Sequence, residues 1–172
     1  MNPRVRLLTN FGAMVAELDP EKAPLTVANF LRYVDRGFYN DTIFHRVIAD
    51  FMIQGGGMMR GVAEKKDTEA PIQNEAANGL RNLKHTLAMA RLPEPHSASS
   101  QFFINTADNA FLDYTAPTGE GFGYCVFGRL IEGGEVADEI NRIETESRSG
   151  YDDVPARDVV LEVAQRIDAP QD

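Results

Sequence analysis

Hydrophobic residues at every second position mark strands at both ends of the chain. The segments 5–9 and 12–18 are apolar, and the second presents Met14 and Leu18 on one face. A turn-prone stretch separates the two segments, so the pattern predicts an opening hairpin. The same alternation in the segment 158–167 predicts a closing strand.

Apolar residues recur at helical spacing in two further segments. Between Pro24 and Gly37 they stand at i, i+3, i+4 and i+7, namely at Val27, Phe30, Leu31 and Val34. Proline suits the first turn of a helix and glycine its end, so this segment predicts a helix over 24–36. A second helix is predicted around 136–143, where Val136, Ile140 and Ile143 are apolar.

The middle of the chain is rich in β-branched and aromatic residues, which favour strands. Strands are predicted at 42–48, 51–54, 87–91, 101–106 and 124–130. Long loops are predicted at 55–82, 92–100 and 113–123. About eight strands with two helices favour a mainly β fold, a closed antiparallel barrel, over an alternating βαβ sheet. We expect one domain over 1–172, with a short tail at about 168–172 that need not be ordered.

Composition narrows the class of protein. The 172 residues are 43% hydrophobic and 25% charged, which is typical of a globular domain. The net charge of −9 repels phosphate backbones, so we expect no nucleic-acid partner. No apolar stretch is long enough for a membrane span, and no membrane partner is expected. The single Cys125 fits a reducing compartment, so the sequence predicts a cytoplasmic protein, which we expect to be a monomer.

One arginine stands inside an apolar strand. Alternation would place Phe44, Arg46 and Ile48 on one face, and an isolated strand arginine is most simply a surface residue. Two further strands pair a polar with an apolar residue on one face, Met52 with Gln54 and Gln101 with Phe103. A shallow site that holds an apolar ring and orients its flanking amides needs this mixture.

Four segments in order carry a specific resemblance: Phe44-His45-Arg46-Val47-Ile48, Phe51-Met52-Ile53-Gln54-Gly55-Gly56, Ser100-Gln101-Phe102-Phe103-Ile104 and Val126-Phe127-Gly128. Together they closely resemble the cyclophilins, the peptidyl-prolyl cis-trans isomerase family, over nearly the whole chain. The resemblance implies an eight-stranded antiparallel barrel capped by two helices, with the substrate groove on its outer surface. It also implies that X-Pro bonds of peptides and folding proteins are the substrate and that no cofactor or metal is used.

The resemblance also assigns roles to single residues. Arg46 matches the family's catalytic arginine, and Phe51 and Gln54 are assigned to the catalytic group with it. Phe51, Met52, Phe103 and Leu112 match the walls of the proline pocket. Gln54, Ala90 and Gln101 match the positions that hold the substrate backbone. Three further groove positions carry altered residue types, Arg91, Phe111 and Tyr124.

These three altered positions resemble the bacterial branch of the family. Many members have tryptophan at the position of Phe111, and its indole N–H donates a hydrogen bond to cyclosporin. Phenylalanine cannot donate, so we expect weakened cyclosporin binding with activity retained. Tyr124 stands where many relatives have histidine, and Arg91 where many have asparagine. An added positive charge at Arg91 would favour acidic residues beside the proline.

Several other interpretations are open. A proline-peptide binding module or chaperone would hold its ligand without turning it, and a structural subunit would dock a partner loop in the groove. A metal site at His45, His85 and His96 is disfavoured by their spacing; we expect His45 to be packed under the sheet and His96 to be solvated. Gly55-Gly56-Gly57 favours a bulge over a phosphate cradle, and Cys125 favours a buried thiol.

Overall fold

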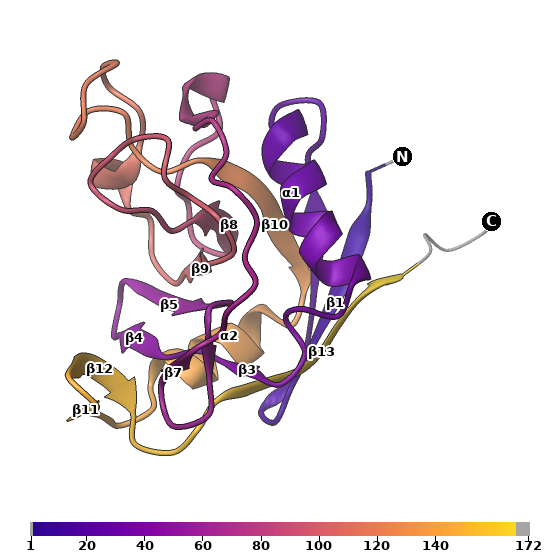
Figure 1. Ribbon diagram of the computed structural model, residues 1–172, viewed down its shortest axis with the longest axis vertical. Helices are drawn as coiled ribbons and strands as arrows, with labels where there is room; N and C mark the ends of the chain where they lie inside the picture. The colour runs from indigo at the N-terminus through magenta and orange to yellow at the C-terminus, as the bar shows by residue number, and fades with distance from the viewer. Residues whose placement is uncertain (1, 168–172) are drawn as a thin grey trace.

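The computed structural model describes residues 2–167, and in this part of the chain eleven strands form one curved sheet (Figure 1). Its strands are β1 (Arg4–Thr9), β2 (Gly12–Leu18), β3 (Thr42–Ile43), β4 (Arg46–Ile48), β5 (Met52–Gly55), β6 (Met58–Met59), β7 (Ala63–Glu64), β8 (Thr86–Met89), β9 (Phe102–Asn105), β10 (Val126–Glu132) and β13 (Val160–Ile167). Their order in the sheet is β4-β5-β9-β8-β10-β2-β1-β13-β3-β6-β7, and neighbouring strands are antiparallel. The tail predicted at 168–172 lies outside the described residues.

The sheet is open, so the predicted closed eight-stranded barrel is wrong. Its two ends, β4 and β7, are not joined by a ladder. The break lies between two short ladders, because β3 pairs with β6 as Ile43 opposite Met58, whereas β4 pairs with β5 as Arg46 opposite Gln54. The three glycines at 55–57 therefore lie opposite only two residues, Phe44 and His45, and this bulge separates the two ladders. The β4–β5 ladder continues to β9, and the β3–β6 ladder continues to β13.

The glycines of this bulge let the backbone approach other segments closely. A Cβ on Gly55 would lie 2.9 Å from the carbonyl oxygen of Ile43, and one on Gly56 would lie 2.9 Å from the carbonyl oxygen of Ser100. Real side chains do not fit at such distances. The glycine run therefore lies where backbone segments approach one another closely.

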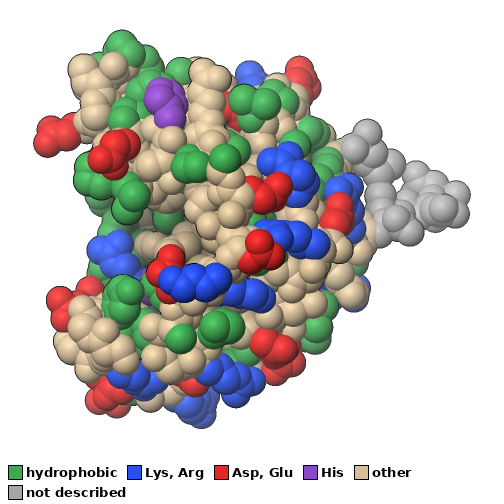
Figure 2. Space-filling model, viewed as in Figure 1, with side chains coloured by type: hydrophobic (Ala, Val, Ile, Leu, Met, Phe, Trp, Pro, Cys, Tyr) green, Lys and Arg blue, Asp and Glu red, His purple; other side chains and the backbone are tan. Residues whose placement is uncertain are grey.

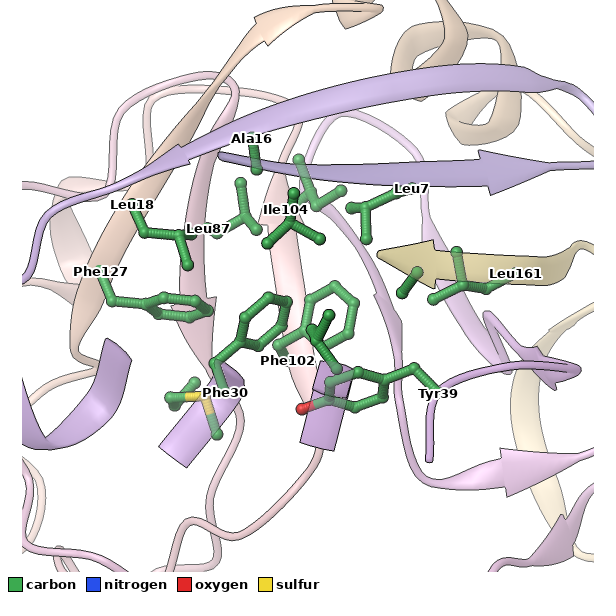
Figure 3. Close-up of a cluster of buried hydrophobic side chains, with 14 of the residues drawn as sticks. Leu7, Ala16, Leu18, Phe30, Tyr39, Leu87, Phe102, Ile104, Phe127 and Leu161 are labelled. Carbon is green, nitrogen blue, oxygen red and sulfur yellow. The ribbon is translucent and has the colours of Figure 1, made fainter. Parts of the chain in front are cut away.

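The main core lies on the inner face of the sheet, where helix α1 (Pro24–Asp35) covers it (Figure 1). The four residues predicted at helical spacing in α1 are all buried in this core. Phe30 packs edge-on against Phe102 of β9, with 5.3 Å between ring centroids, and Figure 3 shows it among Leu18, Leu87 and Phe127. Helix α2 (Gly134–Asn141) packs with β2, β4 and β5. The predicted helices are thus confirmed within a few residues.

A distant carboxylate caps the first turn of α1. Ala23 at the N-cap has no side-chain acceptor. Instead, Glu75 accepts hydrogen bonds from the backbone N–H groups of Leu25 (3.3 Å) and Thr26 (2.7 Å), and from the Thr26 hydroxyl (2.7 Å). A negative charge at this end of a helix also complements its dipole. The predicted loop 55–82 therefore has a structural function, and it contains β6, β7 and a short 3-10 helix, Ala76–Asn78.

A two-stranded ribbon, β11 (Thr145–Arg148) and β12 (Tyr151–Pro155), was not predicted. Its residues are mostly polar and show no clear alternation. It lies beside β4 at the lower left of Figure 1. Within residues 2–167, no helix has the length and apolar character needed to cross a bilayer.

Candidate active site

A cavity of about 120 Å³ opens on the outer face of the sheet, opposite the main core. Its lining contains nine of the eleven predicted site residues: Arg46, Phe51, Met52, Gln54, Ala90, Arg91, Phe103, Leu112 and Tyr124. The other two lie next to it. Gln101 accepts a hydrogen bond from Gln54 (2.9 Å), and the ring of Phe111 is 5.5 Å from that of Phe51. The structure thus brings all eleven residues together.

Strand register explains why these residues meet. Arg46 of β4 is opposite Gln54 of β5, which is opposite Phe103 of β9, which is opposite Ala88 of β8. Side chains directly opposite each other lie on the same face of a sheet. Arg46 and Phe103 are therefore two strand spacings apart, about 10 Å between backbones. A long arginine side chain can cover this distance above Gln54.

Arg46 is an exposed residue, and among residues 2–167 no ion pair or hydrogen bond engages its guanidinium. Val47 points the other way, into the main core, as alternation predicts. The expectation that Phe44 shares the face of Arg46 is wrong, because Phe44 is 1% exposed and lies in the main core. Phe44 and His45 lie between β3 and β4, opposite the glycine bulge, and belong to neither strand, so the alternation is interrupted there. Arg46 thus presents free donors at the mouth of the cavity.

The floor of the cavity is a separate apolar cluster on the outer face. Met52, Phe103 and Leu112 are buried in it, together with Ala88 and Val126. The rings of Phe103 and Tyr124 meet edge-on at 5.8 Å. Phe111 lies at the rim, with 75% of its surface exposed. The site therefore has a small apolar floor, with the free cation of Arg46 and the aromatic rings of Phe51 and Tyr124 in its lining.

The other arginine of the lining, Arg91, is already occupied. Its Nε donates to the carbonyl of Gly123 (2.9 Å), Nη1 donates to Leu92 (2.9 Å) and Pro93 (3.2 Å), and Nη2 donates to Gly119 (3.1 Å). The guanidinium also lies over the ring of Tyr124, at 4.7 Å from its centroid. Four of its five N–H donors are used. Arg91 thus fastens the loop 92–100 to the loop 113–123, and these contacts argue against a free charge for acidic substrates.

Comparisons with known proteins identify the family of this chain. The family model described as "Cyclophilin type peptidyl-prolyl cis-trans isomerase/CLD" matches residues 4–165. This chain belongs to the cyclophilin family. Its predicted enzyme class, peptidyl-prolyl cis-trans isomerase, is therefore confirmed.

Bacterial relatives are similar to this cyclophilin over almost their full length. A Streptomyces antibioticus protein named peptidyl-prolyl cis-trans isomerase cyp18 is 56% identical over 161 residues, which is 94% of this chain and 96% of that protein. Peptidyl-prolyl cis-trans isomerase B of Escherichia coli is 51% identical, over 90% of this chain and 93% of that protein.

Solved structures confirm the fold type. A cyclophilin type peptidyl-prolyl cis-trans isomerase of Cryptosporidium parvum has a TM-score of 0.80 and 25% identity, covering 99% of this chain and 100% of that one. A second structure of that protein, in the presence of the dipeptide Ala-Pro, has a TM-score of 0.78 and 25% identity, covering 96% and 99%. A mainly β cyclophilin fold with two helices is thus confirmed, in an open form.

The histidines of this cyclophilin have separate environments. His45 is 5% exposed, and burial first and the Arg46 charge second lower its pKa to about 4. His85 is 2.9 Å from a carboxylate oxygen of Asp138. His96 is an exposed loop residue, as predicted; its Nδ1 accepts the backbone N–H of Asn74 (3.0 Å) and its ring packs on Phe122. Across 2–167, no three His, Cys, Asp or Glu residues are grouped as metal ligands.

The lone cysteine is a structural thiol. Cys125 is buried in the main core, where desolvation raises its pKa to about 11. A thiol with so high a pKa is a poor nucleophile at neutral pH.

On the face shown in Figure 2, basic and acidic side chains are interspersed.

Proposed function

We propose that this cyclophilin turns X-Pro peptide bonds by holding the proline ring in the outer-face cavity while Arg46 stabilises the twisted amide. The observation that supports this most directly is the register that places Arg46, Gln54 and Phe103 side by side across three strands. The cavity suits a single small apolar ring, and Phe103 and Met52 supply its floor.

The chemistry of the reaction fits a lone cation. Rotation about an X-Pro bond must overcome a barrier of about 18–20 kcal/mol, because the planar amide has partial double-bond character. As the amide twists, its nitrogen gains a lone pair that the planar amide lacks. A guanidinium that donates to this nitrogen stabilises the twisted state more than the planar one, which lowers the barrier. No covalent bond is broken, so the reaction needs no nucleophile and no cofactor.

The remaining polar groups suit the peptide backbone. Gln54 donates through Nε2 to Oε1 of Gln101. This leaves the Gln54 Oε1 as an acceptor and the Gln101 Nε2 as a donor, one for each polar group of a peptide unit. Ala90 lies on the same wall and is tied to Gln101 by a backbone hydrogen bond of 3.1 Å. With the backbone held, rotation is confined to the imide bond.

The test is turnover of an X-Pro peptide by wild type and Arg46→Ala, measured by NMR exchange. We expect a loss of about a hundredfold or more, the usual effect of removing a donor from a transition state. Arg129→Ala is the matched control, because Arg129 is an exposed arginine outside this cavity. Binding of Ala-Pro should remain, because the apolar floor is unchanged. Unchanged turnover in Arg46→Ala removes this residue from the mechanism.

The same experiment separates the alternatives. A binding module or chaperone would hold the peptide without exchange, and a structural subunit would be insensitive to changes in the cavity. The place of Arg46 in the cavity lining, with free donors beside the apolar floor, favours catalysis, because binding a proline ring alone needs no cation there. Partners are then proline-containing peptides and folding proteins. Cytoplasmic location and the monomeric state stay predictions of the sequence.

A further inference from the structure

Three buried asparagines form a chain of hydrogen bonds between two walls of the cavity. Asn82, Asn105 and Asn109 are 1%, 0% and 4% exposed. The Nδ2 of Asn109 donates to the Phe51 carbonyl (2.9 Å) and to Oδ1 of Asn105 (2.8 Å). The Nδ2 of Asn105 donates in turn to Oδ1 of Asn82 (3.0 Å). The Nδ2 of Asn82 then donates to the Tyr124 carbonyl (3.3 Å).

Both ends of this chain belong to the cavity lining. Phe51 stands on one wall and Tyr124 on another. A third lining residue, Leu112, bonds both ends: its backbone N–H donates to the carbonyl of Asn109 (3.0 Å), and its carbonyl accepts from the backbone N–H of Tyr124 (2.9 Å). The proposed proline pocket is thus supported by buried polar groups, although its floor is apolar.

The network leaves no donor unused. Each side-chain amide has two N–H donors. The remaining two go from Asn105 to the Thr86 hydroxyl (3.0 Å) and from Asn82 to Oδ1 of Asp113 (3.1 Å), so all six are satisfied. Buried polar groups that are fully paired hold one arrangement, because any shift leaves a buried group unpaired. A core needing only stability would be served by apolar residues.

We propose that Asn82, Asn105 and Asn109 are positioning residues that fix the spacing between the Phe51 and Tyr124 walls, and so set the affinity for the proline ring. This inference rests on the proposed function of the cavity. It leaves Arg46 outside the network, since Arg46 is carried by β4 and none of the three amides contacts it. Loss of this series of hydrogen bonds should therefore weaken binding of the proline ring and leave the rotation of the X-Pro bond nearly unchanged.

The test compares Asn109→Ala with Thr86→Val. Asn109→Ala cuts the chain at its Phe51 end, while the backbone N–H of Thr106 still holds the Phe51 carbonyl (3.0 Å). Thr86→Val removes a partner of the same Asn105 amide, but off the path between the walls. Asn105→Leu keeps a side chain of similar volume and removes the middle link of the hydrogen-bond series. Thermal unfolding verifies that each variant is folded.

The first readout is the dissociation constant of Ala-Pro, measured by NMR titration, together with KM and kcat for an X-Pro peptide. Asn109→Ala should weaken Ala-Pro binding about fivefold and raise KM equally, with kcat within about twofold, as expected for loss of one or two hydrogen bonds. The second readout is the NMR signal of the Tyr124 backbone amide. It should shift in Asn109→Ala, although the substitution is at the Phe51 end of the hydrogen-bond series. Thr86→Val should move neither.

The outcomes are distinguishable. If the wild type binds no Ala-Pro, the proposed function fails and the network has no role in it. If the wild type binds and Asn109→Ala binds equally well with the Tyr124 signal unmoved, the positioning role is overturned. A fall in kcat with KM unchanged would also overturn it, because the amides would then act on the torsional step rather than on pocket spacing.

Discussion

The contacts of Arg91 predict that its removal costs stability and leaves the preference for flanking residues unchanged. In Arg91→Ala, four hydrogen bonds to backbone carbonyls and the contact with the Tyr124 ring are lost. Hydrogen bonds to a charged group contribute about 1.5–3 kcal/mol when shielded, and far less when solvent competes. Only the bond to Gly123 is partly buried. We therefore expect a loss of about 2 kcal/mol in the free energy of unfolding.

The assay is urea unfolding followed by circular dichroism, since the chain has no tryptophan. For a domain of this size, a loss of 2 kcal/mol also lowers Tm by about 4–8 °C. Arg91→Lys should recover less than half, because an ammonium cannot reach carbonyls on both loops as a planar fork does. Arg81→Ala is the control, as Arg81 is 70% exposed and makes a single ion pair at 4.0 Å.

Peptides with an acidic or a neutral residue beside the proline complete the experiment. With its donors occupied, Arg91 should contribute little to their discrimination, so the ratio of kcat/KM values should change less than about twofold in Arg91→Ala. The reasoning is refuted if stability is unchanged while the acidic peptide alone loses turnover. That result would mean that the guanidinium leaves the loops to bind substrate.

Two further predictions concern His45 and Phe111. Because the folded pKa of His45 lies near 4, below its usual value of 6.5, the unfolded chain binds the proton first, and stability should fall by about 2 kcal/mol from pH 7 to pH 5. Calorimetry of His45→Gln should show a smaller fall over this window, and an identical slope would contradict the assignment. Phe111→Trp restores the missing N–H donor on an exposed rim residue, so calorimetric titration should show about tenfold tighter cyclosporin binding, and equal affinities would exclude that role.

Local patterns predict much of this cyclophilin, because period and spacing act within one element. The helix over 24–36, the burial of Phe102 and Ile104, and the outward face of Gln54 and Phe103 all follow from alternation or helical repeat. The resemblance to the family added which strands meet. Nine of the predicted residues therefore line one cavity, although they come from five separate parts of the chain.

Features that depend on long-range contacts could not be predicted. The sequence around Arg91 shows a charge beside the groove, but two of its four partners, the carbonyls of Gly119 and Gly123, lie 28 and 32 residues further along the chain. Asn82, Asn105 and Asn109 have no periodicity that marks a network. The ribbon β11–β12 is mostly polar and buries only Val154 and Pro155, which are adjacent, so no hydrophobic alternation indicates it. Each of these depends on backbone positions that only the folded chain sets.

The glycine bulge at 55–57 affects both the sheet and the candidate active site. A residue with a Cβ at position 57 would place that atom 2.4 Å from Cγ of Gln101, so the side chain of Gln101 could not lie there. Gln101 would then lose its contact with Gln54, which is the polar pair opposite the apolar slot. The extra residue that interrupts the ladder between β3–β6 and β4–β5 is also part of this glycine run. The same local feature therefore prevents closure of the barrel and makes room for the polar side of the groove.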